Sequence, residues 1–573
     1  MRCSWVTDSA QWTTERLNLR LATSHSSLVT ALLLLVTCHL LLVTALLRAQ
    51  TQGPATLDYT RQHEMAVSSA QIQGPKALRD YVVQGKLRLT LEDAIRLTLL
   101  NNTDIRVNQS QVQQAKYNVL GAYQPFDPLL SSSFNATRTT ISASSELQGA
   151  PTVSNLSHVG QVAYTQTFQT GTIFSTGLNV SRASTNSSFF FLNPNYSSGL
   201  SFSVTQPLLR NRGFFPNQAP IVIARRNLAQ SRASFEAQVN NLIAQAVSQY
   251  WAVVEARESL KVSRSSVEQA EATYKQNKRA LELGALPPMD IYRSEAELAQ
   301  RRVVAIQEEY ALKQAEDQFR QVIGADLDPF IRALDAELVE DPAPQGELLT
   351  IDAETAQERA LANRPELEAL RQQIANDETS VRVAHNALLP DLELGALYAS
   401  NGLGGNLLTN TTPPAVIPGG LGDAFSQLFG FGFPTYGGTL TLNLPIRNRG
   451  AKASLGRAEV VRRNDLYLLR RQMQVITLDV ANAVHQLEQA KLSMAAAKLS
   501  RDLQQKNLEG EQRKYELGGQ PIFFVLDAQR NLATAEESLV QSEVGYQLAL
   551  TAVDRATGTL LPRYHLQVEE LTR

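Results

Sequence analysis

Two long stretches of this 573-residue chain carry an apolar residue at almost every seventh position. The first column is Val239, Ala246, Val253, Leu260, Val267, Tyr274 and Leu281, before a turn at 283–288. The second is Leu466, Met473, Val480, Leu487, Met494, Leu508 and Tyr515, interrupted only by Arg501, before a turn at 517–521. Such a repeat stays on one face only if the helix underwinds to about 3.5 residues per turn. The pattern therefore predicts two coiled-coil hairpins, the first over about 236–324, with arms about 60 Å long at about 1.5 Å per residue.

A shorter helix is predicted ahead of each hairpin. In the first half it begins after Thr90, which forms an approximate capping box with Asp93, and it ends before Pro125. Residues 101–105 correspond to 363–367, and Pro128 corresponds to Pro390, both at an offset of 262. The chain therefore contains the same arrangement twice.

Between the short helix and the hairpin, the apolar period changes to two in both halves. Apolar residues alternate with Ser, Thr, Asn and other small residues, which predicts strands of about 7–10 residues with one apolar and one polar face. The apolar positions are Val162, Tyr164, Phe168, Phe174, Leu178, Val180, Leu200, Phe202, Val204, Leu392, Leu394, Ala396, Tyr398, Leu440, Leu442 and Leu444. The predicted loops cover 142–158, 183–198 and 401–435.

Two architectures can use such strands. In a soluble sandwich the apolar faces pack together, and in a transmembrane barrel they face lipid. We favour the barrel because the polar faces are small and mostly uncharged and because the strands lie at the ends of rods. Each strand region returns to helix through Arg-Asn-Arg-Gly, at 210–213 and 447–450. A proline shortly before it ends the strand, and its glycine permits a tight turn.

The N-terminal region indicates export. Residues 28–47 are mostly apolar, with arginines on both sides. We interpret them as part of a signal peptide (1–49) rather than a retained anchor. Cys38 is a poor lipoprotein cysteine because Thr37 precedes it and the apolar run continues. Both cysteines lie in this leader, so disulfide chemistry is not expected in the exported protein.

The duplicated order of helix, strands, Arg-Asn-Arg-Gly and heptad hairpin resembles the TolC-like outer-membrane efflux proteins. The most specific match is Tyr515-Glu516-Leu517-Gly518 followed by Val525-Leu526-Asp527-Ala528-Gln529, with Leu283-Gly284 and Asp290 in the first half. The resemblance implies an α+β membrane protein. Its coiled-coil hairpins form a periplasmic α-barrel, and its strands contribute to a trimeric outer-membrane β-barrel. It also implies a domain order of flexible linker (50–86), first repeat (87–340), second repeat (341–561) and C-terminal tail (562–573).

The same resemblance implies a passive exit duct for a tripartite efflux or type I secretion system. Its partners would be two further copies of the chain, outer-membrane lipid, a periplasmic adaptor protein and an inner-membrane pump. The adaptor-contacting tips would be Leu283, Gly284, Ala285, Leu517, Gly518 and Gly519. The periplasmic gate would include Asp290, Tyr515, Phe524 and Asp527.

Three departures from the family pattern affect these expectations. Phe524 stands where some members carry a further gate aspartate, and Gln520 where an arginine can sit. The first strand region, from Pro128 to Pro207, has about 80 residues against about 55 in the second. An extra hairpin around Gly171 would either enlarge the barrel or fold outside it, where two strands per half and a 12-stranded trimer are typical.

Enzymatic activity is not expected. No Gly-x-Ser-x-Gly, His-Glu-x-x-His or Walker pattern occurs, and the seven histidines are too scattered to suggest a local metal site. The near balance of 53 basic and 55 acidic residues gives no basic patch for nucleic acid. We therefore predict no cofactor and no metal. The alternative function is a periplasmic or surface coiled-coil structural protein, which would not need lipid-compatible strands.

Overall fold

The computed structural model describes residues 75, 77–188, 190–284, 288–326, 328–344, 346–409 and 415–566. The predicted signal peptide, both cysteines and most of the predicted linker lie outside these residues. None of the helices in the described ranges is long and apolar enough to cross a membrane.

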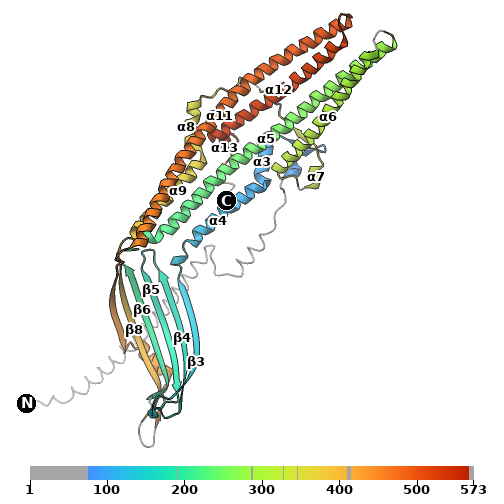
Figure 1. Ribbon diagram of the computed structural model, residues 1–573. Coiled ribbons are helices and arrows are strands. Elements are labelled where there is room, and N and C mark those ends of the chain that lie inside the picture. The colour runs from blue at the N-terminus through green and yellow to red at the C-terminus, as the bar shows by residue number, and fades with distance from the viewer. Residues whose placement is uncertain are drawn as a thin grey trace, which may run out of the picture. The chain divides into compact units, whose positions relative to one another are not determined.

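Two antiparallel helical hairpins dominate the described chain (Figure 1). They pair α5 (Phe214–Glu282) with α6 (Pro288–Val322), and α11 (Arg449–Glu516) with α12 (Ile522–Thr557). At 69 and 68 residues, α5 and α11 are each about 100 Å long at about 1.5 Å per residue. Helix α5 begins at Phe214, well before the predicted start near Glu236. Its first part packs against shorter helices of the same chain, so its apolar residues need not follow a coiled-coil repeat.

The heptad columns are buried in their middle sections. Val239, Ala246, Val253 and Leu260 are buried in α5, as are Val480, Leu487, Met494 and Leu508 in α11. At the start of the second column, Leu466 and Met473 remain 44% and 41% exposed. A single chain therefore leaves part of the heptad surface uncovered.

The short helix predicted in each half is divided in two. In the first half, α3 (Leu91–Asn101) is followed by α4 (Thr103–Gly121), and in the second, α8 (Ala353–Asn363) is followed by α9 (Pro365–Asn386). The expected capping box is present, with Thr90 and Asp93 bonded reciprocally at 3.1 and 3.2 Å. The prediction of one unbroken helix up to Pro125 is wrong. Asn102 is extended and caps α4, and Arg364 is extended because Pro365 follows it.

One antiparallel sheet has the order β10-β8-β6-β5-β4-β3, and a short strand, β9, also pairs with β8. Its strands are β3 (Leu129–Ser142), β4 (Thr152–Thr167), β5 (Ile173–Thr185), β6 (Leu192–Pro207), β8 (Asp391–Leu408), β9 (Val416–Ile417) and β10 (Pro434–Asn443). Pairings such as Val162 with Leu178, and Phe202 with Tyr398, place the predicted apolar residues on one face. The hairpin around Gly171 joins β4 to β5 within this sheet rather than folding away from it.

Most strands are longer than predicted, up to 18 residues in β8. Parts of the predicted loops 142–158, 183–198 and 401–435 are strand. The sequence did not predict strand there because these parts lack a regular alternation of apolar and polar residues. The turn into α5 places Gly213 at φ 83°, as its glycine suggests. In the second half, Asn448 takes the left-handed conformation at φ 31°, and Gly450 already belongs to α11. The role assigned to that second glycine is therefore wrong.

Smaller elements complete the fold. A three-stranded sheet has the order β1-β2-β7 and packs with α3 and α5 around a core that includes Leu89, Tyr250 and Phe319. These elements are η1 (Leu78–Tyr81), β1 (Val82–Val83), β2 (Lys86–Leu89), η2 (Gln124–Phe126), η3 (Glu146–Gln148), α7 (Pro329–Arg332), β7 (Ala336–Leu338), α10 (Leu421–Phe429) and α13 (Leu560–Arg563).

Candidate functional site at the helix tips

The tip of each hairpin is a helix end closed by a left-handed glycine. Gly284 has φ 74° and donates its amide hydrogen to Leu281 O at 2.9 Å. Gly518 has φ 73° and makes the same bond to Tyr515 O, also at 2.9 Å. Glycine suits this position because other L-residues are strained there by about 1–2 kcal/mol. The two tips thus have the same backbone geometry at corresponding positions.

The tips present apolar side chains to solvent. Leu283 is 83% exposed and Leu517 is 81% exposed. Gly519 donates to Lys514 O at 2.9 Å, which closes the second turn further. Ala285, the remaining predicted tip residue, lies outside the described residues. A pair of exposed leucines on rigid turns is the kind of surface that a protein partner can bury.

Tyr515 connects the two hairpins. Its hydroxyl donates a hydrogen bond to Asn277 Oδ1 of α5 at 3.0 Å. Asn277 is only 1% exposed, and its Nδ2 has no hydrogen-bond partner among the described residues. Burial raises the pKa of Tyr515, and the nearby Asp290 carboxylate raises it further. Asp290 therefore acts on Tyr515 through its charge, while Asn277 accepts the hydrogen bond.

Asp290 lies in the first turn of α6, where its charge also complements the helix N-terminus. Its carboxylate is 3.7 Å from Arg293 Nη1. Its carbonyl oxygen accepts a hydrogen bond from the hydroxyl of Ser294, a residue that is 1% exposed. Asp290 and Tyr515 thus lie on different hairpins, and the charge of one reaches the hydroxyl of the other.

Asp527 belongs to a separate group of charges on α12. Its Oδ2 accepts from Asn531 at 3.1 Å, and its Oδ1 is 3.9 Å from Arg530. Arg530 also reaches Glu297 of α6 at 2.9 Å, and Glu297 pairs with Arg301 at 2.8 Å. Arg530 partly neutralises Asp527 and links this part of α12 to the other hairpin.

Phe524 lies beside these charges. It is 48% exposed, and its ring meets that of Phe523 edge to face at 5.5 Å. On the other side of α12, Ile522 and Val525 are buried. Gln520 donates its side-chain amide to the carbonyl oxygen of Glu511 at 3.0 Å and also to its carboxylate. The glutamine at the expected arginine position therefore ties the second tip to its own hairpin.

Three polar contacts join the hairpins near the tips. They are Tyr515 with Asn277, Gln529 with Thr273 at 3.2 Å, and Arg530 with Glu297. Apart from Tyr515, these residues were not predicted from the sequence. The available signal was that most residues three or four positions from Asn277 and Gln529, on the same helix face, are apolar. Together the contacts can hold the hairpins in one alignment, but they form no nucleophile–base arrangement.

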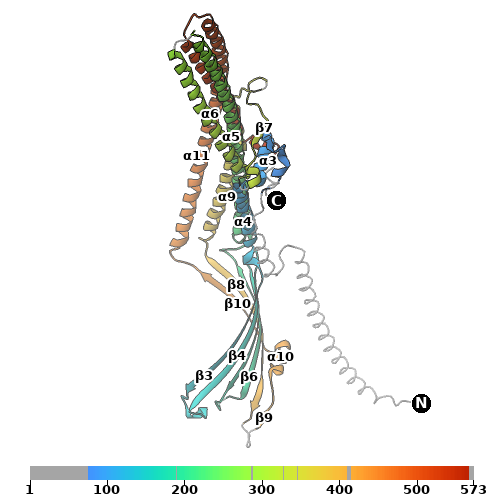
Figure 2. The same cartoon turned by 90° about the vertical axis from the view of Figure 1, so that its right-hand side faces the viewer.

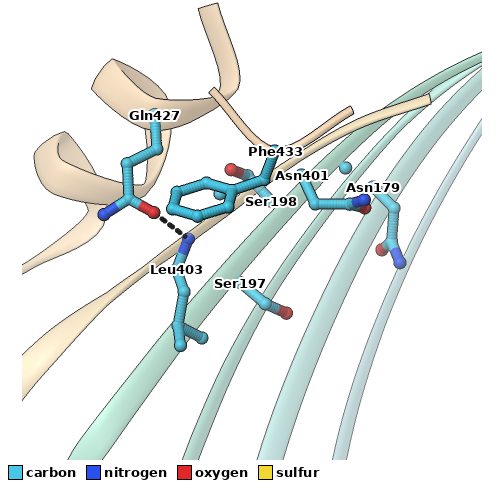
Figure 3. A pocket seen from close by; sticks show the side chains of 9 residues that line it. Asn179, Ser197, Ser198, Asn401, Leu403, Gln427 and Phe433 are labelled. Carbon is cyan, nitrogen blue, oxygen red and sulfur yellow. Dashed lines mark hydrogen bonds between the residues drawn. The ribbon is translucent and has the colours of Figure 1, made fainter. Parts of the chain in front are cut away.

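Away from the tips, the sheet contains a hollow. A cavity of about 570 Å³ is lined by strand residues including Asn179, Ser197 and Asn401, and by Gln427 and Phe433 of the segment between β8 and β10 (Figure 3). Its lining contains no titratable side chain. This hollow offers hydrogen-bonding groups but no acid, base or metal ligand.

Long helical hairpins joined to an antiparallel sheet also occur in solved structures of outer-membrane channels, which share this fold. The Campylobacter jejuni CmeC outer membrane channel superposes with a TM-score of 0.58 at 16% identity, covering 86% of this chain and 90% of that one. The open state of the Neisseria gonorrhoeae MtrE outer membrane channel gives 0.55 at 18%, covering 86% and 98%.

The family model described as "Outer membrane efflux protein" matches residues 94–325 and 356–559, and the chain belongs to this family. A curated relative, pyoverdine export outer membrane protein OpmQ of Pseudomonas putida, is 27% identical over 208 residues. That match covers 35% of this chain and 38% of the relative, so it spans well under half of either. The TolC-like resemblance is confirmed. Members of the family are outer-membrane transport channels, not enzymes.

Proposed function

We propose that this protein is the outer-membrane exit duct of a tripartite efflux or type I secretion system. Three copies form one passive channel, and the helical hairpins extend into the periplasm to meet an adaptor protein and an inner-membrane pump. The exported chain comprises a linker (50–86), two repeats (87–340 and 341–561) and a tail (562–573), after removal of a signal peptide (1–49).

The observation that carries this proposal is the sheet. Its six main strands have an apolar face and a face rich in Ser, Thr and Asn, and β3 and β10 are its two edges. An open sheet edge is not tolerated in lipid because its backbone groups would lack hydrogen-bond partners. Other copies of the chain can pair with both edges and close a barrel.

The extra hairpin around Gly171 changes the size of the proposed barrel. Three copies of a six-stranded sheet make 18 strands, compared with the 12 that four strands per chain would give. Barrel diameter increases roughly in proportion to strand number. The proposed outer-membrane pore is therefore wider than one built from four strands per chain.

The tips supply the proposed gate. The three contacts between the hairpins keep the tip helices aligned in the closed state, and Asp527 and Phe524 contribute charge and an aromatic ring to the aperture. Leu283 and Leu517 offer the adaptor apolar surface. Binding of the adaptor realigns the helices, and substrate then moves through water without any catalytic step. The energy comes from the pump.

The test is the mass and location of the mature protein. We expect it in the outer-membrane fraction and, in detergent, at three times the mass of one mature chain by light scattering. A monomer in detergent would contradict closure by other copies. Recovery in the soluble periplasmic fraction would favour the coiled-coil structural protein instead. The matched control is a variant lacking 129–207, which removes β3 to β6 and should not assemble in the membrane.

A further inference from the structure

Residues 415–433, in the connection between β8 and β10, include α10. This helix lies against one face of the sheet, as Figure 2 shows. Ser198 Oγ donates to Ala424 O at 3.0 Å, and Ser400 Oγ donates to Leu428 O at 2.7 Å. Gln427 Oε1 accepts from Leu403 N at 3.1 Å, the bond drawn in Figure 3. Helix α10 is therefore fixed to β6 and β8 by specific hydrogen bonds.

Two glycines of β8 make this close approach possible. A Cβ on Gly402 would lie 1.9 Å from Ala424 O, and a Cβ on Gly404 would lie 2.2 Å from Gly420 O. Neither position can hold a side chain while the helix stays in place. Both glycines are therefore needed for α10 to pack this closely against β8.

The face that α10 covers is the apolar one. Side chains two residues apart in a strand point to the same side of a sheet. Ser400 therefore lies on the face of Tyr398, and Ser198 on the face of Leu200 and Phe202. Asn401 and Ser197, one position away, lie on the opposite, polar face. In a barrel with a water-filled interior, α10 belongs on the outside.

The outer surface of α10 and of the turn after it is aromatic. Phe425 stacks on Phe429 at 6.0 Å, and Phe429 is 54% exposed. Phe431 is 40% exposed, and its ring lies 6.3 Å from that of Tyr398. These rings continue the apolar surface of the strands at the end farther from the long helices.

Beyond the apolar surface, the same face becomes basic. His158, Arg182, Tyr196 and Gly404 are neighbours in one row across four strands. Arg182 Nε donates to Tyr196 Oη at 3.3 Å, and Arg138 lies on the same face of β3. Moving outward, a row with Phe202 and Tyr398 is followed by a row with Leu178 and Leu200, and the row of Arg182 comes last. An apolar face that ends in cationic side chains matches the hydrocarbon and anionic headgroup layers of a membrane.

We infer that α10 is an interfacial helix that buries Phe425 and Phe429 at the outer rim of the lipid bilayer, with the basic row beside it facing acidic lipid headgroups. This inference rests on the proposed function, because it requires the sheet to be embedded in lipid. It assigns the connection between β8 and β10 to membrane contact rather than to the pore. Amphipathic helices bind at such interfaces through buried apolar area and attraction to anionic lipids.

Nitroxide spin labels can locate the helix. The mature chain proposed above contains no cysteine, so single cysteines are introduced as Phe429→Cys, Leu440→Cys and Leu403→Cys. The labelled proteins are reconstituted in vesicles of phosphatidylcholine and phosphatidylglycerol. Power saturation then compares collision with oxygen, which concentrates in lipid, and with a water-soluble nickel chelate. Leu440 reports the apolar face, and Leu403 reports the polar face near α10.

We expect the label at 429 to resemble that at 440, with oxygen collisions exceeding nickel collisions, and the label at 403 to show the reverse. If 440 is in lipid but 429 is in water, the inference about α10 is overturned and the proposed function stands. If 440 is also in water, both are contradicted. Should the 429 variant fail to assemble, Phe425→Cys tests the same helix surface with the same criteria.

Discussion

Asp377 of α9 and Asp465 of α11 form a buried carboxyl pair between two helices. They are 6% and 9% exposed, and the charge of the Asp465 carboxylate acts directly on Asp377. Burial and the neighbouring Asp465 raise the pKa of Asp377 to about 6, although Gln373 and Arg462 oppose the shift. Asp377 Oδ2 has no hydrogen-bond partner among the described residues, and we predict that the two carboxyl groups share a proton there.

A raised pKa in the folded state makes the stability of the protein depend on pH. The contribution of the pair to the free energy of unfolding is complete below 3.8, the pKa of Asp377 in the unfolded chain. It is lost as the pH rises through about 6, the pKa of Asp377 in the folded protein. A shift of about two units corresponds to about 3 kcal/mol. Because Arg462 offsets part of the repulsion between the carboxylates, this value is the upper limit of the destabilisation of the folded protein at pH 8.

The Asp377→Asn variant should remove the destabilisation that the charged pair causes at pH 8. We expect its free energy of unfolding to exceed that of the unmodified protein by up to about 3 kcal/mol at pH 8, and by less than about 1 kcal/mol at pH 4. Denaturant unfolding in detergent, followed by helical circular dichroism at both pH values, measures the difference. The control on α11 is Asp502→Asn, at a side chain that is 47% exposed and 3.3 Å from Arg501. A variant that gains equally at both pH values, or loses stability at pH 8, would refute the shared proton.

Three further predictions concern the tips. Tyr515→Phe removes the hydroxyl that donates a hydrogen bond to Asn277, which should weaken the contact between the hairpins by about 1–3 kcal/mol and raise channel conductance. The control, Tyr310→Phe at an exposed site, should leave conductance unchanged. Asp527→Ala should raise conductance and weaken cation preference, and an unaltered ion selectivity would argue against its place in the aperture. Phe524→Ala should widen the constriction, so equal conductance in bilayers before and after the change would remove it from the gate.

The long helices could be predicted because few structures besides a coiled coil keep a seven-residue apolar repeat on one face. The same rule failed over the first part of α5, where the packing partners are shorter helices rather than a coiled-coil arm. Strand positions near the long helices followed from alternation, but the outer parts of β4 and β8 lack a regular alternation and carried no such signal. The position of α10 was not predictable, since it depends on the space left by Gly402 and Gly404.

The candidate site was only partly predictable. Motif similarity identified Asp290 and Tyr515, and the structure brings them together from different hairpins. It could not identify Asn277, because the partner of Tyr515 is set by how the two hairpins pack. Nor could it show that Arg530 shares its charge between Asp527 and Glu297, which lie on different helices.

Planar-bilayer conductance of the purified, refolded protein tests the central claim most directly. The account predicts that trimers insert and give a small, cation-preferring conductance, which increases in the Asp527→Ala variant. A protein that stays soluble and produces no conductance would contradict the channel and support a coiled-coil structural role.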